Sequence, residues 1–165
     1  MTADSAQSAI EPSAVGRPQI FLASDHRGFD QKQELHKALA DKDYAIIDLG
    51  PAQENPDDDF NDAALKVAKA VVATEPAYGI LICGSAHGVA MQSNRFRKIR
   101  AITAYDERLA KIGREHEDAN VLCLSADFTD PAENIKIAET FLNTPPLKDE
   151  RYLRRIKRLD EERSI

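Results

Sequence analysis

Residues 78–88 read Tyr-Gly-Ile-Leu-Ile-Cys-Gly-Ser-Ala-His-Gly, and this stretch decides the fold class. Residues 78–82 are almost continuously apolar, as expected of a strand buried on both faces of a parallel sheet. Residues 83–88 form a turn that contains two glycines, and residues 89–96 favour a helix. A buried strand that leads through a glycine-containing turn into a helix is typical of an α/β protein.

The same alternation of apolar runs and helical periods continues on both sides of this stretch. The pattern predicts strands at residues 20–23, 44–49, 78–82, 99–104 and 120–124. It predicts helices at residues 29–40, 60–73, 89–96, 106–116, 131–142 and 149–162. We therefore expect an α/β, Rossmann-like three-layer fold with a five-stranded parallel sheet, plus a charged C-terminal helix.

Composition excludes several classes of protein. The chain has 165 residues, the size of one domain, and a formal net charge of −6, which argues against a nucleic-acid partner. No apolar run approaches the roughly 18 residues of a membrane span. The two cysteines, Cys83 and Cys123, cannot build a disulfide scaffold or a four-ligand zinc site.

The chain divides into a short tail and one domain. Residues 1–17 are rich in Ala, Ser and Pro and show neither the charge pattern nor the apolar run of a secretory signal. We predict a disordered tail there, or an arm that packs on a partner subunit, and a single domain over residues 18–165. The missing signal and the free thiols favour the cytoplasm.

Functional groups gather in two turns that follow predicted strands. The first turn carries Asp25 and His26, and the second carries Cys83 and Ser85. Ligands of such sheets bind at the carboxyl ends of the strands, and in the order 2-1-3 the first and third strands are neighbours. These four side chains are therefore expected to converge on one crevice.

The turn after Cys83 lacks the motifs of several known site types. Gly88 is followed by Val89, so the turn is not a P-loop, and Gly84 directly precedes Ser85, so it is not a nucleophile elbow. What is left is a thiol beside backbone amides that can stabilise an oxyanion, with the thiolate favoured by the start of a helix. This combination suits proton abstraction next to a carbonyl, as well as acyl transfer.

Each candidate also has a purely structural interpretation. Cys83 could be a small buried hydrophobic residue, and Cys123, inside a strand, is expected to be one. His26 could satisfy local backbone groups, and Ser85 and His87 could cap a helix or face solvent. The arginines of the last helix could form a solvated face, although Arg151 and Arg155, at i and i+4, can reach one anion.

Over residues 20–157 the chain resembles ribose-5-phosphate isomerase type B, of the group that includes galactose-6-phosphate isomerase subunits. The resemblance rests on the order and spacing of several short motifs. They are Ser24-Asp25-His26 with Gly28-Phe29, residues 79–85 with Gly88, Asn94, Ile99-Arg100-Ala101, Arg114-Glu115-His116 with residues 118–122, and Arg151 with Arg154-Arg155-Ile156.

The resemblance implies an aldose–ketose isomerase that converts ribose 5-phosphate to ribulose 5-phosphate through a cis-enediolate, without a metal or organic cofactor. It implies that Cys83 is the proton-transferring base, that Ser85 assists it and that His116 opens the sugar ring. Substrate contacts would come from the loop Gly84, Ala86, His87 and Gly88, from Asp25 on sugar hydroxyls, from His26, Arg151 and Arg155 on the phosphate, and from Glu117 beside His116.

The expected position of His116 also indicates a site that is shared between two subunits. The helix at 106–116 follows a strand and runs back antiparallel to it, so it ends roughly 16 Å from the carboxyl edge of the sheet. A catalytic His116 must then serve a neighbouring subunit, and the family is similar in sharing its sites between two subunits. We expect a homodimer, or a dimer of dimers.

This chain departs from the family pattern at five positions. Ser85 stands for Thr, Glu117 for Asn, Asp127 for Arg, Phe60 for Tyr and Ala86 for Gly. Ala86 is strained if its φ is positive. The added carboxylates of Glu117 and Asp127 would weaken anion binding unless Arg97, Arg100 or Arg114 compensates. Two alternatives stay open: a six-carbon sugar-phosphate isomerase and a non-catalytic sugar-phosphate-binding protein. A redox role of the Cys83 thiol is weaker, because no second cysteine lies close in sequence to resolve a sulfenate.

Overall fold

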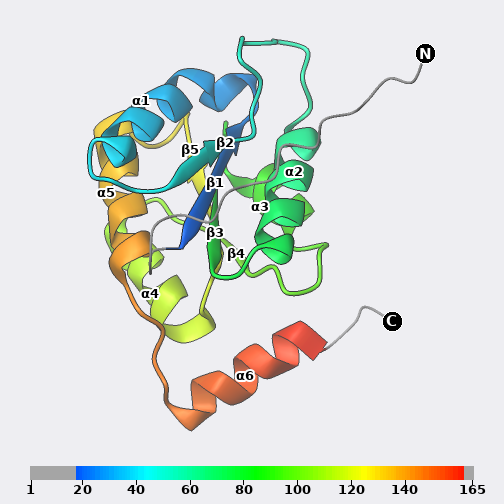
Figure 1. Ribbon diagram of the computed structural model, residues 1–165, viewed down its shortest axis with the longest axis vertical. Helices are drawn as coiled ribbons and strands as arrows, with labels where there is room; N and C mark the ends of the chain where they lie inside the picture. Colours follow the sequence, from blue (N-terminus) through cyan, green and yellow to red (C-terminus); the bar gives the residue numbers. More distant parts are fainter. Residues whose placement is uncertain (1–17, 162–165) are drawn as a thin grey trace, which may run out of the picture.

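The computed structural model describes residues 18–161, which form a parallel sheet with helices on both faces (Figure 1). The sheet has five strands in the order β2-β1-β3-β5-β4, all parallel. The strands are β1 Gln19–Ser24, β2 Ile46–Asp48, β3 Ala77–Cys83, β4 Ala101–Thr103 and β5 Val121–Ser125. The expected α/β fold and the 2-1-3 order of the first three strands are confirmed. The predicted tail at residues 1–17 lies outside the described residues.

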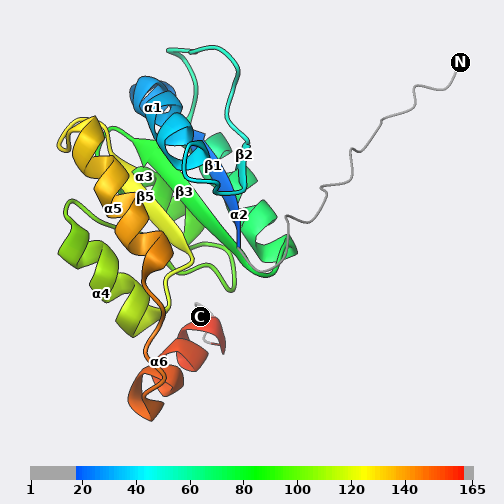
Figure 2. The ribbon, with the colours of Figure 1, turned by 60° about the vertical axis from the view of Figure 1, so that its left-hand side comes forward.

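Helices α2 and α3 cover one face of the sheet, and α1, α4 and α5 cover the other (Figures 1 and 2). Alternate residues of each central strand enter the two cores: Phe21 and Leu81 pack toward α2 and α3, while Leu22 and Ile80 pack toward α1 and α5. This double burial explains the almost continuous apolar runs. The helices are α1 Phe29–Ala40, α2 Phe60–Ala73, α3 His87–Ser93, α4 Glu107–Glu117, α5 Pro131–Asn143 and α6 Glu150–Glu161.

The two edge strands and α3 differ from their predicted lengths. β2 and β4 have three residues each, where the sequence predicted six, because an edge strand is paired on one side alone. α3 begins at His87 rather than at residue 89 and ends at Ser93. α1 and α2 have the predicted bounds.

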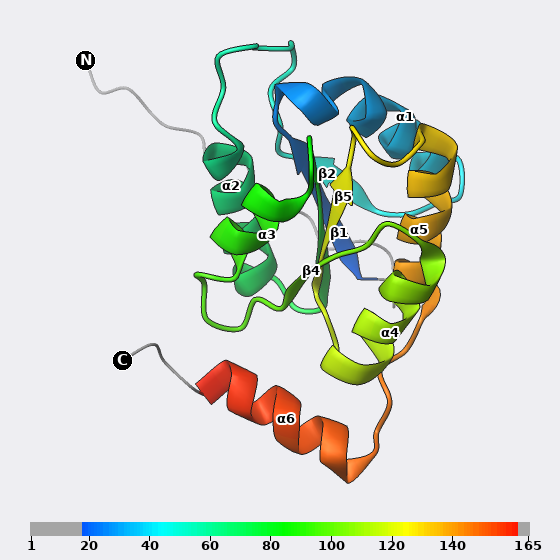
Figure 3. The same ribbon diagram turned by 180° about the vertical axis from the view of Figure 1, so that it is seen from behind.

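Helix α6 lies apart from the two cores, below the amino ends of the strands (Figure 3). It has no buried residue, and its apolar Leu153 and Leu159 are exposed. Its contacts with the rest of the chain include the stacking of Tyr152 on His116 of α4 and the hydrogen bonds of Arg97 and Arg100, before β4, to Asp160. Within residues 18–161 no helix is both long and apolar enough to cross a bilayer.

Candidate active site

The turns after β1 and β3 lie side by side, because these strands are paired along their whole length, with Ser24 opposite Ile82. Asp25, His26, Cys83 and Ser85 therefore lie at the same edge of the sheet, as the sequence predicted. Gly28 allows this approach: a Cβ there would lie 2.6 Å from the carbonyl oxygen of Ile82. A side chain at position 28 would push the two turns apart.

Cys83 is the last residue of β3 and is buried, with an exposed fraction of 4%. Burial raises the pKa of the Cys83 thiol, and the nearby Asp25 raises it further. Backbone N–H groups of Val89, Ala86 and Ser85 act in the opposite direction. The sequence predicted a favoured thiolate, and this is wrong for a single chain, because desolvation outweighs the N–H groups.

The loop after Cys83 has a strained centre at Ala86. Ala86 is fully buried and has φ 70° and ψ −15°, in the left-handed region that costs an L-residue about 1–2 kcal/mol. The positive φ considered from the sequence is therefore present. Backbone N–H groups of Ser85 and Ala86 act on the Cys83 thiol and lower its pKa against the effect of burial. Such an array of donors beside a thiol is able to stabilise an oxyanion.

Asp25 and His26 occupy the neighbouring turn. Burial raises the pKa of the Asp25 carboxyl, whose Oδ1 accepts a hydrogen bond from the Gly28 N–H at 3.2 Å. His26 Nδ1 lies 2.8 Å from Asp58 Oδ1, and the same oxygen accepts the His26 backbone N–H at 3.0 Å. The hydrogen bond to Asp58 raises the pKa of His26. This imidazole therefore holds its positive charge to a higher pH than an ordinary histidine, which suits binding of an anion.

Two further family-pattern departures line this edge. Phe60 packs its ring against Gly88, where a Cβ would lie 2.9 Å from the ring. Asp127 lies over Gly84 and pairs with Arg27 at 2.6 Å. The sequence offered Arg97, Arg100 or Arg114 to compensate for the carboxylates of Glu117 and Asp127, and for Asp127 the paired cation is Arg27 instead.

His116 lies at the opposite edge of the sheet from Cys83. It is the second-last residue of α4, whose end precedes β5 by three residues, so it lies near the amino ends of the strands. Its ring stacks on Tyr152 of α6, with centroids 4.6 Å apart and planes at 12°. A hollow of about 330 Å³ at this place is lined by His116, Glu117, Arg155, Ile156, Arg158 and Leu159. The position expected from helix length is confirmed.

Arg151 and Arg155 also belong to this second group and not to the group around Cys83. Both are exposed on α6, and Arg151 lies over the Tyr152 ring at 4.9 Å. Its backbone N–H is bound by Asp149 Oδ1 at 2.9 Å. One chain therefore carries two separated groups of candidate residues, one at each edge of its sheet.

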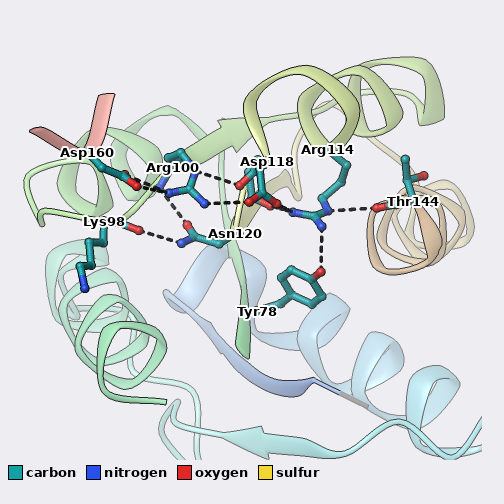
Figure 4. Close-up of polar contacts among 9 residues, drawn as sticks. Tyr78, Lys98, Arg100, Arg114, Asp118, Asn120, Thr144 and Asp160 are labelled. Atoms are coloured by element: carbon teal, nitrogen blue, oxygen red, sulfur yellow. Dashed lines mark hydrogen bonds and ion pairs between the residues drawn. The ribbon is translucent and has the colours of Figure 1, made fainter. Parts of the chain in front are cut away.

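A partly buried ionic network links α4 and α6, the helices that carry the second group (Figure 4). Arg114, 2% exposed, donates to Asp118 Oδ1, to the Thr144 carbonyl and to the Tyr78 hydroxyl. Arg100 Nη1 donates to both carboxylate oxygens of Asp160 on α6, at 2.9 and 3.0 Å. Arg100 also contacts Asp118, so the end of α4 and the helix α6 are joined through one set of charges.

The sequence did not reveal three partners of these residues. They are Asp58, Arg27 and Tyr105, to which no role was assigned from the sequence. Each acts across a long sequence separation, and no local spacing signals such a contact. Within residues 18–161 no group of three or more His, Cys, Asp and Glu side chains is arranged to hold a metal ion.

The sheet, the two turns at its carboxyl edge and the thiol beside loop amides define an α/β protein with a candidate catalytic cysteine. The model of the Ribose/Galactose Isomerase family matches residues 20–159. The chain therefore belongs to the ribose/galactose isomerase family.

Similar proteins agree with this membership. A probable ribose-5-phosphate isomerase B of Mycoplasma genitalium is 39% identical over 141 residues, covering 85% of this chain and 92% of that protein. The crystal structure of the M. genitalium ribose-5-phosphate isomerase B with bound ribulose-5-phosphate has a TM-score of 0.82 and 38% identity, over 86% of this chain and 93% of that chain. The crystal structure of a ribose 5-phosphate isomerase from Thermotoga maritima has a TM-score of 0.84 and 33% identity, over 89% of this chain and 100% of that chain.

Proposed function

We propose that this protein is an aldose–ketose isomerase that interconverts ribose 5-phosphate and ribulose 5-phosphate. The observation that carries the proposal is the thiol of Cys83 at a strand end, faced by the N–H groups of Ser85, Ala86 and Val89. A relative with this fold has been solved with ribulose-5-phosphate bound. The reaction needs a base and an oxyanion site within reach of one carbon, and this loop offers both.

The proton transfer uses Cys83. The thiolate removes the proton from C2 of the open-chain aldose, and the electron pair forms the C1–C2 double bond of a cis-enediolate. The negative charge on oxygen is stabilised by the N–H groups of the loop from Gly84 to Gly88. The Cys83 thiol then returns the proton to C1, which gives the ketose. The Ser85 hydroxyl assists the transfer of the hydroxyl proton from the C2 oxygen to the C1 oxygen.

Binding of the phosphate depends on cations from both groups of residues. His26, whose pKa is raised by the hydrogen bond to Asp58, serves from the carboxyl edge, while Arg151 and Arg155 serve from α6. Asp25 binds the sugar hydroxyls, and His87 and Glu117 lie at the rim of the same site. These cations also favour the thiolate of Cys83, against the effect of burial.

We further propose a homodimer in which each site takes Cys83 from one subunit and His116 from the other. The separation of the two groups to opposite edges of one sheet supports this arrangement, because a single chain cannot bring His116 to Cys83. His116 then acts as the acid and base that opens the sugar ring. Because a catalytic thiol must be kept reduced, we propose a cytoplasmic location.

The test is an assay of ribulose 5-phosphate formation by the purified protein, with Cys83→Ala as the matched variant. Turnover by the wild type and none by Cys83→Ala supports the proposal, while full activity of Cys83→Ala refutes the role of the thiol. His116→Asn is expected to lose turnover of the cyclic sugar and largely keep turnover of an open-chain substrate. Equal loss on both would contradict ring opening.

Substrate competition tests the alternatives. Stronger inhibition and faster turnover with allose or galactose 6-phosphate would assign a six-carbon substrate instead. Tight binding of ribose 5-phosphate with no turnover, by a folded protein, would favour a binding role. Either result would replace the proposed activity.

A further inference from the structure

Each carbonyl group of the loop from Cys83 to Ser85 accepts a hydrogen bond from a residue at or just after the end of β5 or β4. The Cys83 carbonyl accepts the Ala126 N–H at 2.9 Å, and the Gly84 carbonyl accepts the Asp127 N–H at 3.0 Å. The Ser125 hydroxyl also donates to the Gly84 carbonyl, at 2.6 Å. A peptide plane whose carbonyl is fixed on one side presents the following N–H on the other side. These contacts therefore determine where the loop N–H groups point.

The third carbonyl, that of Ser85, is held by a side chain with no assigned role. The Tyr105 hydroxyl donates to it at 2.7 Å. Tyr105 follows β4 by two residues, and β4 is separated from β3 by β5, so this side chain reaches across a strand to the loop. The bond lies directly before Ala86, the strained residue of the loop. Strained backbone persists only where its surroundings fix it.

His87 completes the arrangement around Tyr105. Its Nε2 lies 2.9 Å from the Tyr105 hydroxyl. A phenol has one proton, and Tyr105 uses it on the Ser85 carbonyl, so His87 Nε2 must be the donor in this contact. The His87 ring packs edge-on against the Tyr105 ring, with centroids 6.2 Å apart. The tyrosine is thus held in one rotamer by the first residue of the helix that the loop enters.

We infer that Tyr105 is a positioning residue of the proposed isomerase: its hydroxyl, oriented by His87, fixes the Ser85 carbonyl so that the N–H of Ala86 faces the Cys83 sulfur and the developing enediolate. The inference rests on the proposed function for its effect on turnover. The expected effect of Tyr105 on the reactivity of the Cys83 thiol depends on the loop geometry alone. The two effects are measured separately.

Tyr105→Phe removes the hydroxyl and keeps the ring, which makes it the sharpest test. The expected result is a fall in kcat of about tenfold, the size of one lost hydrogen bond in the transition state, with KM changed by less than about twofold. The matched control is Tyr44→Phe, whose hydroxyl accepts from Asn143 far from the loop, and which is expected to keep wild-type kcat. Ser125→Ala removes the donor to the Gly84 carbonyl and is expected to act in the same direction as Tyr105→Phe.

A second readout does not depend on substrate. Alkylation of Cys83 by iodoacetamide, followed across pH by peptide mass spectrometry, reports how well the loop N–H groups stabilise the thiolate. In Tyr105→Phe the profile is expected to move to higher pH, while in Tyr44→Phe it matches the wild type. An alkylation profile of Tyr105→Phe that matches the wild type would overturn the inference. An equal loss of kcat in Tyr105→Phe and Tyr44→Phe would also overturn it. If the wild type does not act on ribose 5-phosphate, the proposed function fails, and the alkylation profile still decides the role of Tyr105.

Discussion

Cys83 and His116 lie at opposite edges of the same sheet. Cys83 ends β3, and His116 lies near the end of α4, which runs back along the sheet for about 16 Å at the usual rise of a helix. No rotamer change of either side chain closes such a separation. If both residues act on one substrate, as the proposed function requires, they come from different subunits.

Mixing two inactive variants tests this arrangement. Cys83→Ala keeps His116, and His116→Asn keeps Cys83, so a mixed dimer has one site with both wild-type residues and one with neither. Random mixing of equal amounts makes half of the dimers mixed, and we expect about one quarter of wild-type activity. The measurement is ribose 5-phosphate turnover after unfolding and refolding the two variants together. Each variant refolded alone is the control, and a mixture that stays inactive would contradict the shared site.

The contact between His26 and Asp58 predicts a pH dependence of substrate binding. Asp58 raises the pKa of His26, so the charge that binds phosphate is complete below the ordinary histidine range and is lost as pH rises through the raised value. Asp58→Asn removes the carboxylate and moves this loss to lower pH. We expect KM of Asp58→Asn to rise several-fold near neutral pH and to approach the wild-type value near about pH 5.5. Parallel pH profiles of the two proteins would show that His26 does not bind the phosphate.

The sequence predicted the sheet because each central strand is buried on both faces and each turn is marked by glycine or polar residues. Phe21 and Ile80 show this burial, and the bounds of α1 and α2 follow from clear helical periods. The edge strands were predicted too long, since their apolar residues continue past the last ladder contact. The positions of β5 and β4 in the sheet were not predicted, because the sequence of a connecting segment does not indicate beside which strand the next strand pairs.

The sequence predicted the residues of the candidate site that directly follow or end a strand, but not the distant residues that contact them. Asp25, His26, Cys83 and Ser85 lie together because two neighbouring strands end there. Two of their partners, Asp58 and Tyr105, are 32 residues from His26 and 20 residues from Ser85. The pKa of Cys83 was predicted in the wrong direction, because burial depends on packing that a motif does not describe.

The ion pair between Arg100 and Asp160 predicts an effect on substrate affinity. It attaches α6, which carries Arg151 and Arg155, to the residue that directly precedes β4. Asp160→Asn weakens this attachment, and we expect KM for ribose 5-phosphate to rise by about threefold to tenfold with a smaller change in kcat. Glu161→Gln is the matched control, because Glu161 pairs with Lys157 on the same exposed face of α6. Equal KM values for Asp160→Asn and the wild type would show that the attachment does not position the helix.

Replacement of Arg114 is expected to lower the free energy of unfolding by a large amount. Its guanidinium is buried against the Tyr78 and Phe141 rings, at 4.7 and 5.5 Å from their centroids, and pairs with Asp118 at 2.7 Å.

Arg114→Met keeps much of the side-chain volume but leaves Asp118 and two carbonyl groups without their donor. Removing one member of a buried pair costs about 3–5 kcal/mol, and the partial exposure of Asp118 reduces the expected loss to about 2–4 kcal/mol in the free energy of unfolding. Lys111→Met is the control on the same helix: Lys111 is exposed and lies 3.8 Å from Glu115, so its loss is expected to cost about 0.5 kcal/mol or less. Urea unfolding of the three proteins measures both values, and similar midpoints for Arg114→Met and Lys111→Met would mean that the network of Figure 4 does not stabilise the fold.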